Sequence, residues 1–118
     1  MHEQRRHPRF DLADEGWRAT LTDQVTGESL GEVVNLSLGG MMVLGPAALQ
    51  AEHLYQIELV ATGPRGQAES FSAGVLALWA TPAGRPGTSW TGFEIIDIGT
   101  EERERLAALT GSFSSGEH

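Results

Sequence analysis

The chain has 118 residues and contains neither cysteine nor lysine. Without cysteine it can form no disulfide framework and no thiolate metal site, so a reducing compartment is expected. No stretch approaches the roughly 20 apolar residues that a membrane-spanning helix needs. The first residues are polar and no apolar run follows them, which is not the pattern of a secretory signal. Together these absences predict one cytoplasmic domain.

The sequence patterns of catalytic and metal sites are missing as well. The four histidines never pair at the i, i+4 spacing that places two ligands on one helix face, so no metal site is predicted. There is no nucleophile elbow and no phosphate-binding P-loop. The interpretation is therefore a protein without catalytic activity and without a cofactor. The histidines are His2, His7, His53 and His118.

Charge is distributed unevenly along the chain. The formal net charge is −8, which argues against binding to long nucleic acid, because that needs a broad basic face. Against this background, Arg5, Arg6 and Arg9 lie close together in Arg5-Arg6-His7-Pro8-Arg9. The planar guanidinium can hold a phosphate or a guanine edge at two points and can stack on flat rings. The cluster indicates a small, shaped anion, although a solvated basic tail is the alternative.

Alternating apolar residues predict a mainly β fold with a single helix. In residues 68–79 the alternation runs through Phe71 and Val75 and ends with Trp79 in the same register, a position that is more often core than ligand site. The helix is expected to begin with Thr100 as its N-cap and to end near Gly111, covering an open end of a small antiparallel barrel or sandwich. Residues 46–53 remain open, with one helical turn as a possibility. The predicted strands are residues 16–23, 29–36, 41–44, 54–60, 68–79 and 89–97.

A polar turn, Asn35-Leu36-Ser37-Leu38-Gly39-Gly40, is the second candidate binding element. Such a turn can place hydroxyl, amide and backbone donors around a ligand. Its simpler interpretation is a hairpin in which glycine is needed for backbone conformation alone. Neither the arginine cluster nor this turn is specific by itself, and their combination is more informative.

The pair Arg5-x-x-x-Arg9 and Asn35-x-Ser37-x-x-Gly40 resembles the signature of PilZ domains. The resemblance extends over most of residues 5–98. It implies a six-stranded antiparallel β-barrel of the split-barrel type with a C-terminal α-helix. The residues themselves predict a flexible N-terminal arm (residues 1–10), which shows no alternation, and a disordered tail at 112–118 after the helix stop. The barrel with its helix is then expected over residues 11–111. Further similar segments are Phe10, Met41-Met42-Val43, Gly74-Val75 leading to Trp79, and Gly92-Phe93-Glu94-Ile95.

The resemblance also implies a ligand, the bacterial second messenger cyclic di-GMP. Arg5 and Arg9 would contact phosphate and guanine. Asn35 and Ser37 would hydrogen-bond the other guanine and the phosphate, and Gly40 would let the backbone approach the ligand. Two further candidates are Arg6, as an additional phosphate contact, and Trp79, at the border of the site. Gln4, which precedes the first motif arginine, disfavours an intercalated ligand pair.

The function that the resemblance implies is a single-domain receptor that signals to an unidentified partner protein when the ligand orders its arm. The alternative is a PilZ-like adaptor that binds no nucleotide and acts through protein contacts, for example in type IV pilus assembly. Such adaptors typically lack the motif pair, so its presence favours the receptor. The regulated process, such as motility or biofilm formation, stays open.

Overall fold

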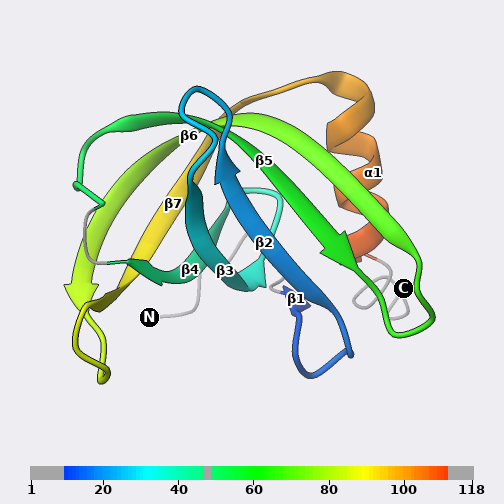
Figure 1. The fold of residues 1–118 in the computed structure, drawn as a ribbon. Helices are drawn as coiled ribbons and strands as arrows, with labels where there is room; N and C mark the ends of the chain where they lie inside the picture. Colours follow the sequence, from blue (N-terminus) through cyan, green and yellow to red (C-terminus); the bar gives the residue numbers. More distant parts are fainter. Residues whose placement is uncertain (1–9, 47–48, 112–118) are drawn as a thin grey trace, which may run out of the picture.

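The computed structural model describes residues 10–46 and 49–111. They form seven strands and one helix (Figure 1). The strands are β1 (Phe10–Asp11), β2 (Arg18–Asp23), β3 (Ser29–Leu36), β4 (Gly40–Pro46), β5 (Leu54–Thr62), β6 (Ala68–Pro82) and β7 (Thr88–Ile98), and the helix is α1 (Thr100–Gly111).

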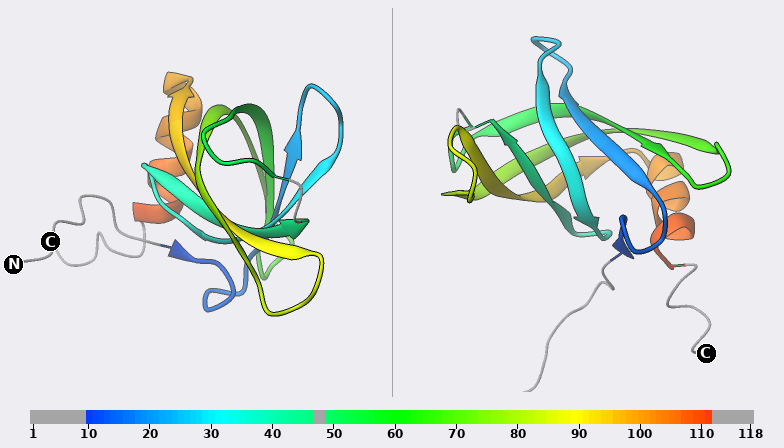
Figure 2. Two further views of the ribbon diagram at one scale, coloured as in Figure 1. Left: turned by 90° about the vertical axis from the view of Figure 1, so that its left-hand side faces the viewer. Right: turned by 60° about the horizontal axis from the view of Figure 1, so that its bottom comes forward.

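Six of the strands close into an antiparallel barrel. The sheet has the order β1-β3-β2-β5-β6-β7-β4, and an additional pairing of β3 with β4 closes the ring. Figure 2 shows this ring from its end. Closure leaves no long unpaired edge for unwanted association. The predicted six-stranded barrel is therefore confirmed, with the two-residue strand β1 as an addition outside the ring.

The barrel core is built from the inward-facing residues of the alternating strands. On β6, Phe71, Ala73, Val75 and Ala77 are all buried, as the alternation predicts. They pack with buried side chains from every other strand and from the helix in one continuous cluster. The largest fully buried side chains are Phe10, Leu12, Leu21, Leu36, Ile57, Leu59, Val43, Val75 and Thr91.

Trp79 breaks the predicted alternation of β6. The register between β6 and β7 shifts between Ala77 and Trp79, where Leu78 is the additional residue of a β-bulge. Because one extra residue exchanges the two faces of a strand, Trp79 turns outward and is 43% exposed. The prediction that Trp79 continues the inward register was wrong, and β6 extends to Pro82.

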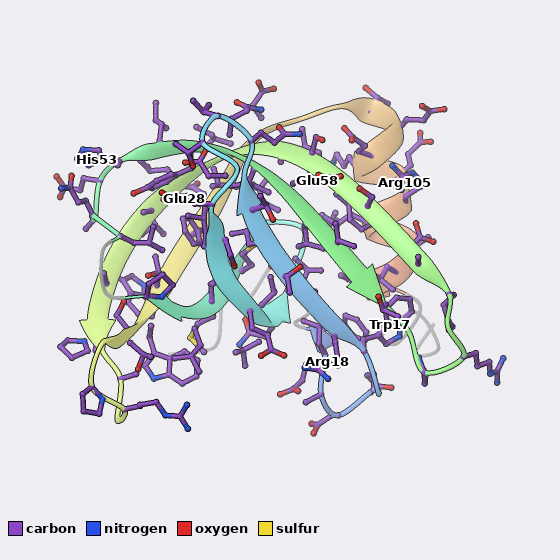
Figure 3. All side chains as sticks on the ribbon, in the orientation of Figure 1. Trp17, Arg18, Glu28, His53, Glu58 and Arg105 are labelled. Carbon is purple, nitrogen blue, oxygen red and sulfur yellow. The ribbon has the colours of Figure 1, made fainter. Side chains whose placement is uncertain are left out.

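The helix α1 packs against β6 at one end of the barrel (Figure 1). Leu106 is 2% exposed and belongs to the core. The backbone N–H of Ser72 donates to Glu102 Oε2 at 3.0 Å. Arg105, labelled in Figure 3, lies over the Phe71 ring at 5.0 Å and pairs with Glu69. These contacts fix the helix on the first half of β6.

Two local predictions are corrected. The first helical hydrogen bond runs from the Arg103 N–H to the Gly99 carbonyl, so Gly99 and not Thr100 is the N-cap residue. The described part of residues 46–53 forms a turn at Ala51 and Glu52 rather than a helical turn. No helix in the described ranges is long and apolar enough to cross a membrane.

Candidate functional site

One row of cross-strand neighbours crosses four strands on the outside of the barrel. Asn35 of β3 pairs with Met42 of β4, Met42 pairs with Gly92 of β7, and Gly92 pairs with Trp79 of β6. A Cβ atom added to Gly92 would lie 2.5 Å from the Trp79 indole. The indole therefore lies directly over Gly92 and occupies the space that a side chain at this position would need.

Gly92 and Trp79 both line a groove of about 250 Å³ on this face of the barrel. Asn35 and Ser37 supply polar groups, and Trp79 supplies an exposed aromatic surface. The structure thus brings four residues predicted from the sequence into the same groove, although they come from two segments far apart in the chain. They are Asn35, Ser37 and Gly40 of one turn and Trp79 of β6. The complete lining is Asn35, Ser37, Gly39, Gly40, Met41, Met42, Leu78, Trp79, Gly92 and Phe93.

Ser37 organises the turn between β3 and β4. Its backbone N–H donates to the Gly40 carbonyl at 2.8 Å. Its hydroxyl oxygen accepts from the N–H groups of Gly39 and Gly40 at 3.2 and 3.3 Å. The side chain thereby satisfies backbone donors that the tight turn would otherwise leave unpaired. Removing this hydroxyl would loosen one wall of the groove.

Gly40 is required by the packing of β4 against β7. A Cβ atom at this position would clash with the Phe93 carbonyl oxygen and would lie 3.4 Å from the Glu94 Cα. The Gly39 carbonyl also accepts from the Ile95 N–H at 2.9 Å, which holds the turn on β7. The barrel itself thus demands glycine here, independently of any ligand.

The described chain begins directly beside the Asn35-x-Ser37 motif. In β1, Phe10 pairs with Leu36 and Asp11 pairs with Asn35. Phe10 is 2% exposed and meets the Trp17 ring edge-on at 6.3 Å between centroids. The predicted ligand contacts Arg5, Arg6 and Arg9 lie outside the described residues, and Arg9 is the direct neighbour of Phe10 in the sequence.

Sequence reasoning did not name six lining residues of the groove as site residues, which are Gly39, Met41, Met42, Leu78, Gly92 and Phe93. Gly92 had a usable signal, because a glycine inside a strand often marks the close approach of another group. Met42 and Leu78 had none, since their position depends on the pairing of distant strands. In the parts of the chain that the structure describes, no group of His, Asp and Glu side chains could hold a metal ion.

The barrel, the turn and the groove define a known class of domain. The model of the PilZ domain family matches residues 3–112, and the chain belongs to this family. No curated protein sequence matches the chain.

Three of the solved structures with the same fold come from three bacteria. The PilZ domain of YcgR from Escherichia coli, solved with c-di-GMP, is 19% identical with a TM-score of 0.66, and the match covers 98% of this chain and 95% of that domain. The Bacillus subtilis inhibitor of motility MotI/DgrA is 13% identical with a TM-score of 0.68 over 99% of this chain and 54% of MotI. The K. pneumonia MrkH-c-di-GMP complex is 13% identical with a TM-score of 0.67 over 98% of this chain and 55% of MrkH. The chain thus spans about half the length of MotI and of MrkH.

Proposed function

We propose that the protein is a receptor for cyclic di-GMP. The observation that carries this proposal is the pairing of β1 with β3, because β1 directly follows the predicted arginine arm in the sequence and pairs with Asn35 of the groove. Phe10 pairs with Leu36, and consecutive Cα atoms are 3.8 Å apart, so the Arg9 Cα must lie close to Leu36. The Arg5 Cα can lie no farther than about 18 Å from that of Phe10, so the arm can reach the groove. The PilZ family membership and the c-di-GMP complexes of YcgR and MrkH support the same ligand.

The groups at the groove suit a compact dianion with two purine rings. Asn35 offers an amide donor and acceptor for a guanine edge, and Trp79 offers an exposed ring for stacking. In the proposal, Arg5 and Arg9 bind phosphate and guanine, and Arg6 adds a phosphate contact. Ser37 and Gly40 shape the turn that faces the ligand.

In the proposal, the signal arises when the ligand orders the arm. The ligand would hold residues 1–10 across the groove of the barrel (residues 11–111) and thereby change the surface that a partner protein meets. Residues 112–118 would form a tail without a role in binding. The groups at the site bind rather than react, so we propose no catalytic step, and the lack of cysteine fits a cytoplasmic receptor.

Tryptophan fluorescence tests the proposal at the level of single residues. Cyclic di-GMP should quench the emission saturably, and Trp79→Phe should remove most of the quench. Arg9→Ala and Ser37→Ala should each weaken binding at least about tenfold, since each loses charged or turn-forming contacts. Arg65→Ala is the matched control, because Arg65 is exposed in the turn between β5 and β6, away from the groove. No quench and no binding by the wild-type protein would contradict the receptor and favour the adaptor.

A further inference from the structure

A second groove on the same barrel carries most of the remaining exposed apolar surface. Six large apolar side chains in the described ranges are exposed, namely Val25, Leu54, Val60, Leu78, Trp79 and Ile96. Leu78 and Trp79 line the first groove. Val25, Leu54 and Ile96 line the second groove, of about 400 Å³, and only Val60 belongs to neither. Exposed apolar side chains that gather in one hollow mark an interaction site more often than scattered ones do.

The floor of the second groove is a glycine between two strands. Gly74 of β6 pairs with Gln56 of β5 on one side and with Asp97 of β7 on the other. A Cβ atom added to Gly74 would lie 3.3 Å from the Asp97 Cβ, so a side chain here would fill the groove. The second groove therefore depends on a glycine in the interior of a strand.

The hairpin between β2 and β3 holds Val25 firmly at the wall of this groove. The Gln24 N–H donates to the Gln56 carbonyl at 2.8 Å, and Gln24 Nε2 donates to Ser72 Oγ at 3.1 Å. Asp23 Oδ1 accepts from the Val25 N–H at 2.8 Å. Val25 is nevertheless 81% exposed, at a position where turns usually carry polar residues or glycine. The turn is rigidly built, and its tip presents an apolar side chain.

The charge around the groove is negative. Asp97 lines it, Glu94 lies two residues from Ile96 on the same strand, and Glu28 belongs to the hairpin (Figure 3). The sequence contains no arginine or lysine between Arg18 and Arg65, and none occurs in β3, β4, β5, β6 or β7. A second copy of this acidic chain, an anionic lipid surface or a nucleic acid would be repelled.

One cross-strand row of residues connects the second groove to the first. Gly40, Glu94, Leu76 and Leu54 form one cross-strand row, from the turn of the nucleotide groove to the wall of the second groove. A partner seated in the second groove would therefore lie next to a ligand and arm held in the first.

We infer that the groove of Val25, Leu54 and Ile96 binds a basic amphipathic segment of a partner protein, with apolar side chains between Gly74 and Val25 and Lys or Arg facing Asp97 and Glu94. The inference rests on the proposed function in that it names the surface through which the receptor reaches its partner. Its test contains no nucleotide, so that its failure and a failure to bind cyclic di-GMP are separate results.

The test is an amide NMR titration of the full chain with two model helical peptides, one of leucine and lysine and one of leucine and glutamate. The lysine peptide should shift the amides of the β2–β3 hairpin, of the start of β5 and of the end of β7, and the glutamate peptide should not. Leu54→Gln and Ile96→Gln should each lower the affinity for the lysine peptide about fivefold, and Asp97→Asn should lower this affinity as well. All are exposed positions, and the amide spectrum itself reports whether each variant is folded.

Val60→Gln is the matched control, because Val60 is 40% exposed on β5 but lies outside both grooves. It should leave the peptide affinity unchanged. The inference would be overturned by shifts centred elsewhere, by equal binding of both peptides, by no binding of either, or by an equal effect of Val60→Gln. A dimer in sedimentation that Ile96→Gln dissociates would also overturn it, because the occupant would then be a second copy.

Discussion

Gly92 and Trp79 shape the candidate nucleotide groove at the level of single residues. The indole lies over the glycine, and any side chain at 92 must displace it. We therefore expect Gly92→Val to weaken cyclic di-GMP binding by about tenfold or more, since base stacking on an aromatic ring contributes about 1–3 kcal/mol. Fluorescence titration measures this. Gly84→Ala is the control, because a Cβ atom there meets no atom within 4 Å. Equal affinities for Gly92→Val and wild type would refute this role of the glycine.

A substitution at Gly40 can show whether this motif glycine is needed for the packing of the barrel or for ligand binding. Its Cβ would clash with the backbone of β7, so Gly40→Ala should destabilise the barrel by about 2 kcal/mol even without ligand. Thermal unfolding in the absence of nucleotide should then show a melting temperature lower by roughly 5–10 °C. An unchanged melting temperature together with lost binding would show instead that the glycine serves the ligand alone.

At this scale the sequence predicts some residues better than others. Asn35, Ser37 and Gly40 are found through their spacing, because they lie in one turn. The outward position of Trp79 is not predictable in this way, since the bulge at Leu78 arises from the pairing of β6 with β7. An alternating pattern gives the face of a residue only as long as no extra residue interrupts the strand.

Among the elements, α1 places one buried apolar side chain, Leu106, in the barrel core. Leu106 is buried among residues of β5, β6 and β7, whereas most of the helix is exposed. Leu106→Ala should lower the free energy of unfolding by about 2–5 kcal/mol. Urea denaturation measures it, and Ala108→Ser, at an exposed position of the same helix, should change it by only about 0.5 kcal/mol. Equal effects of the two substitutions would mean that the helix contributes little to the core.

The elements also show where sequence patterns stop being informative. Strands β2, β3, β5 and β7 lie close to their predicted bounds, because each runs over six or more residues. β1 has two residues, too few for any periodicity, and it forms only because Phe10 and Asp11 meet Leu36 and Asn35. Yet β1 directly follows the predicted arm in the sequence and pairs with Asn35 of the groove.

At the scale of the whole molecule, the acidic surface limits the choice of ligands. The net charge of −8 disfavours contact with a long polyanion, whereas a small dianion needs only a local cluster of arginines. We expect no gel shift of duplex DNA at about 0.15 M salt, at protein concentrations that saturate with cyclic di-GMP. A gel shift of duplex DNA that depends on residues 1–10 would show instead that the arginines bind nucleic acid.

Closure of the barrel is likewise a property of the whole molecule. Strand patterns alone fit a barrel or a sandwich, because they do not specify which strands are neighbours. The pairing of β3 with β4 closes the ring and brings Asn35 next to Met42 and Gly92. The groove therefore exists only in the closed barrel, which is why the motif resemblance predicted some of its residues and strand periodicity predicted none of its shape.

Isothermal titration calorimetry of the wild-type protein with cyclic di-GMP tests the central claim most directly. The account predicts saturable heat at micromolar ligand, and loss of that heat in Arg9→Ala with an unchanged melting temperature, since Arg9 precedes the described barrel. Absence of heat at micromolar ligand with folded wild-type protein, or undiminished binding by Arg9→Ala, would contradict it.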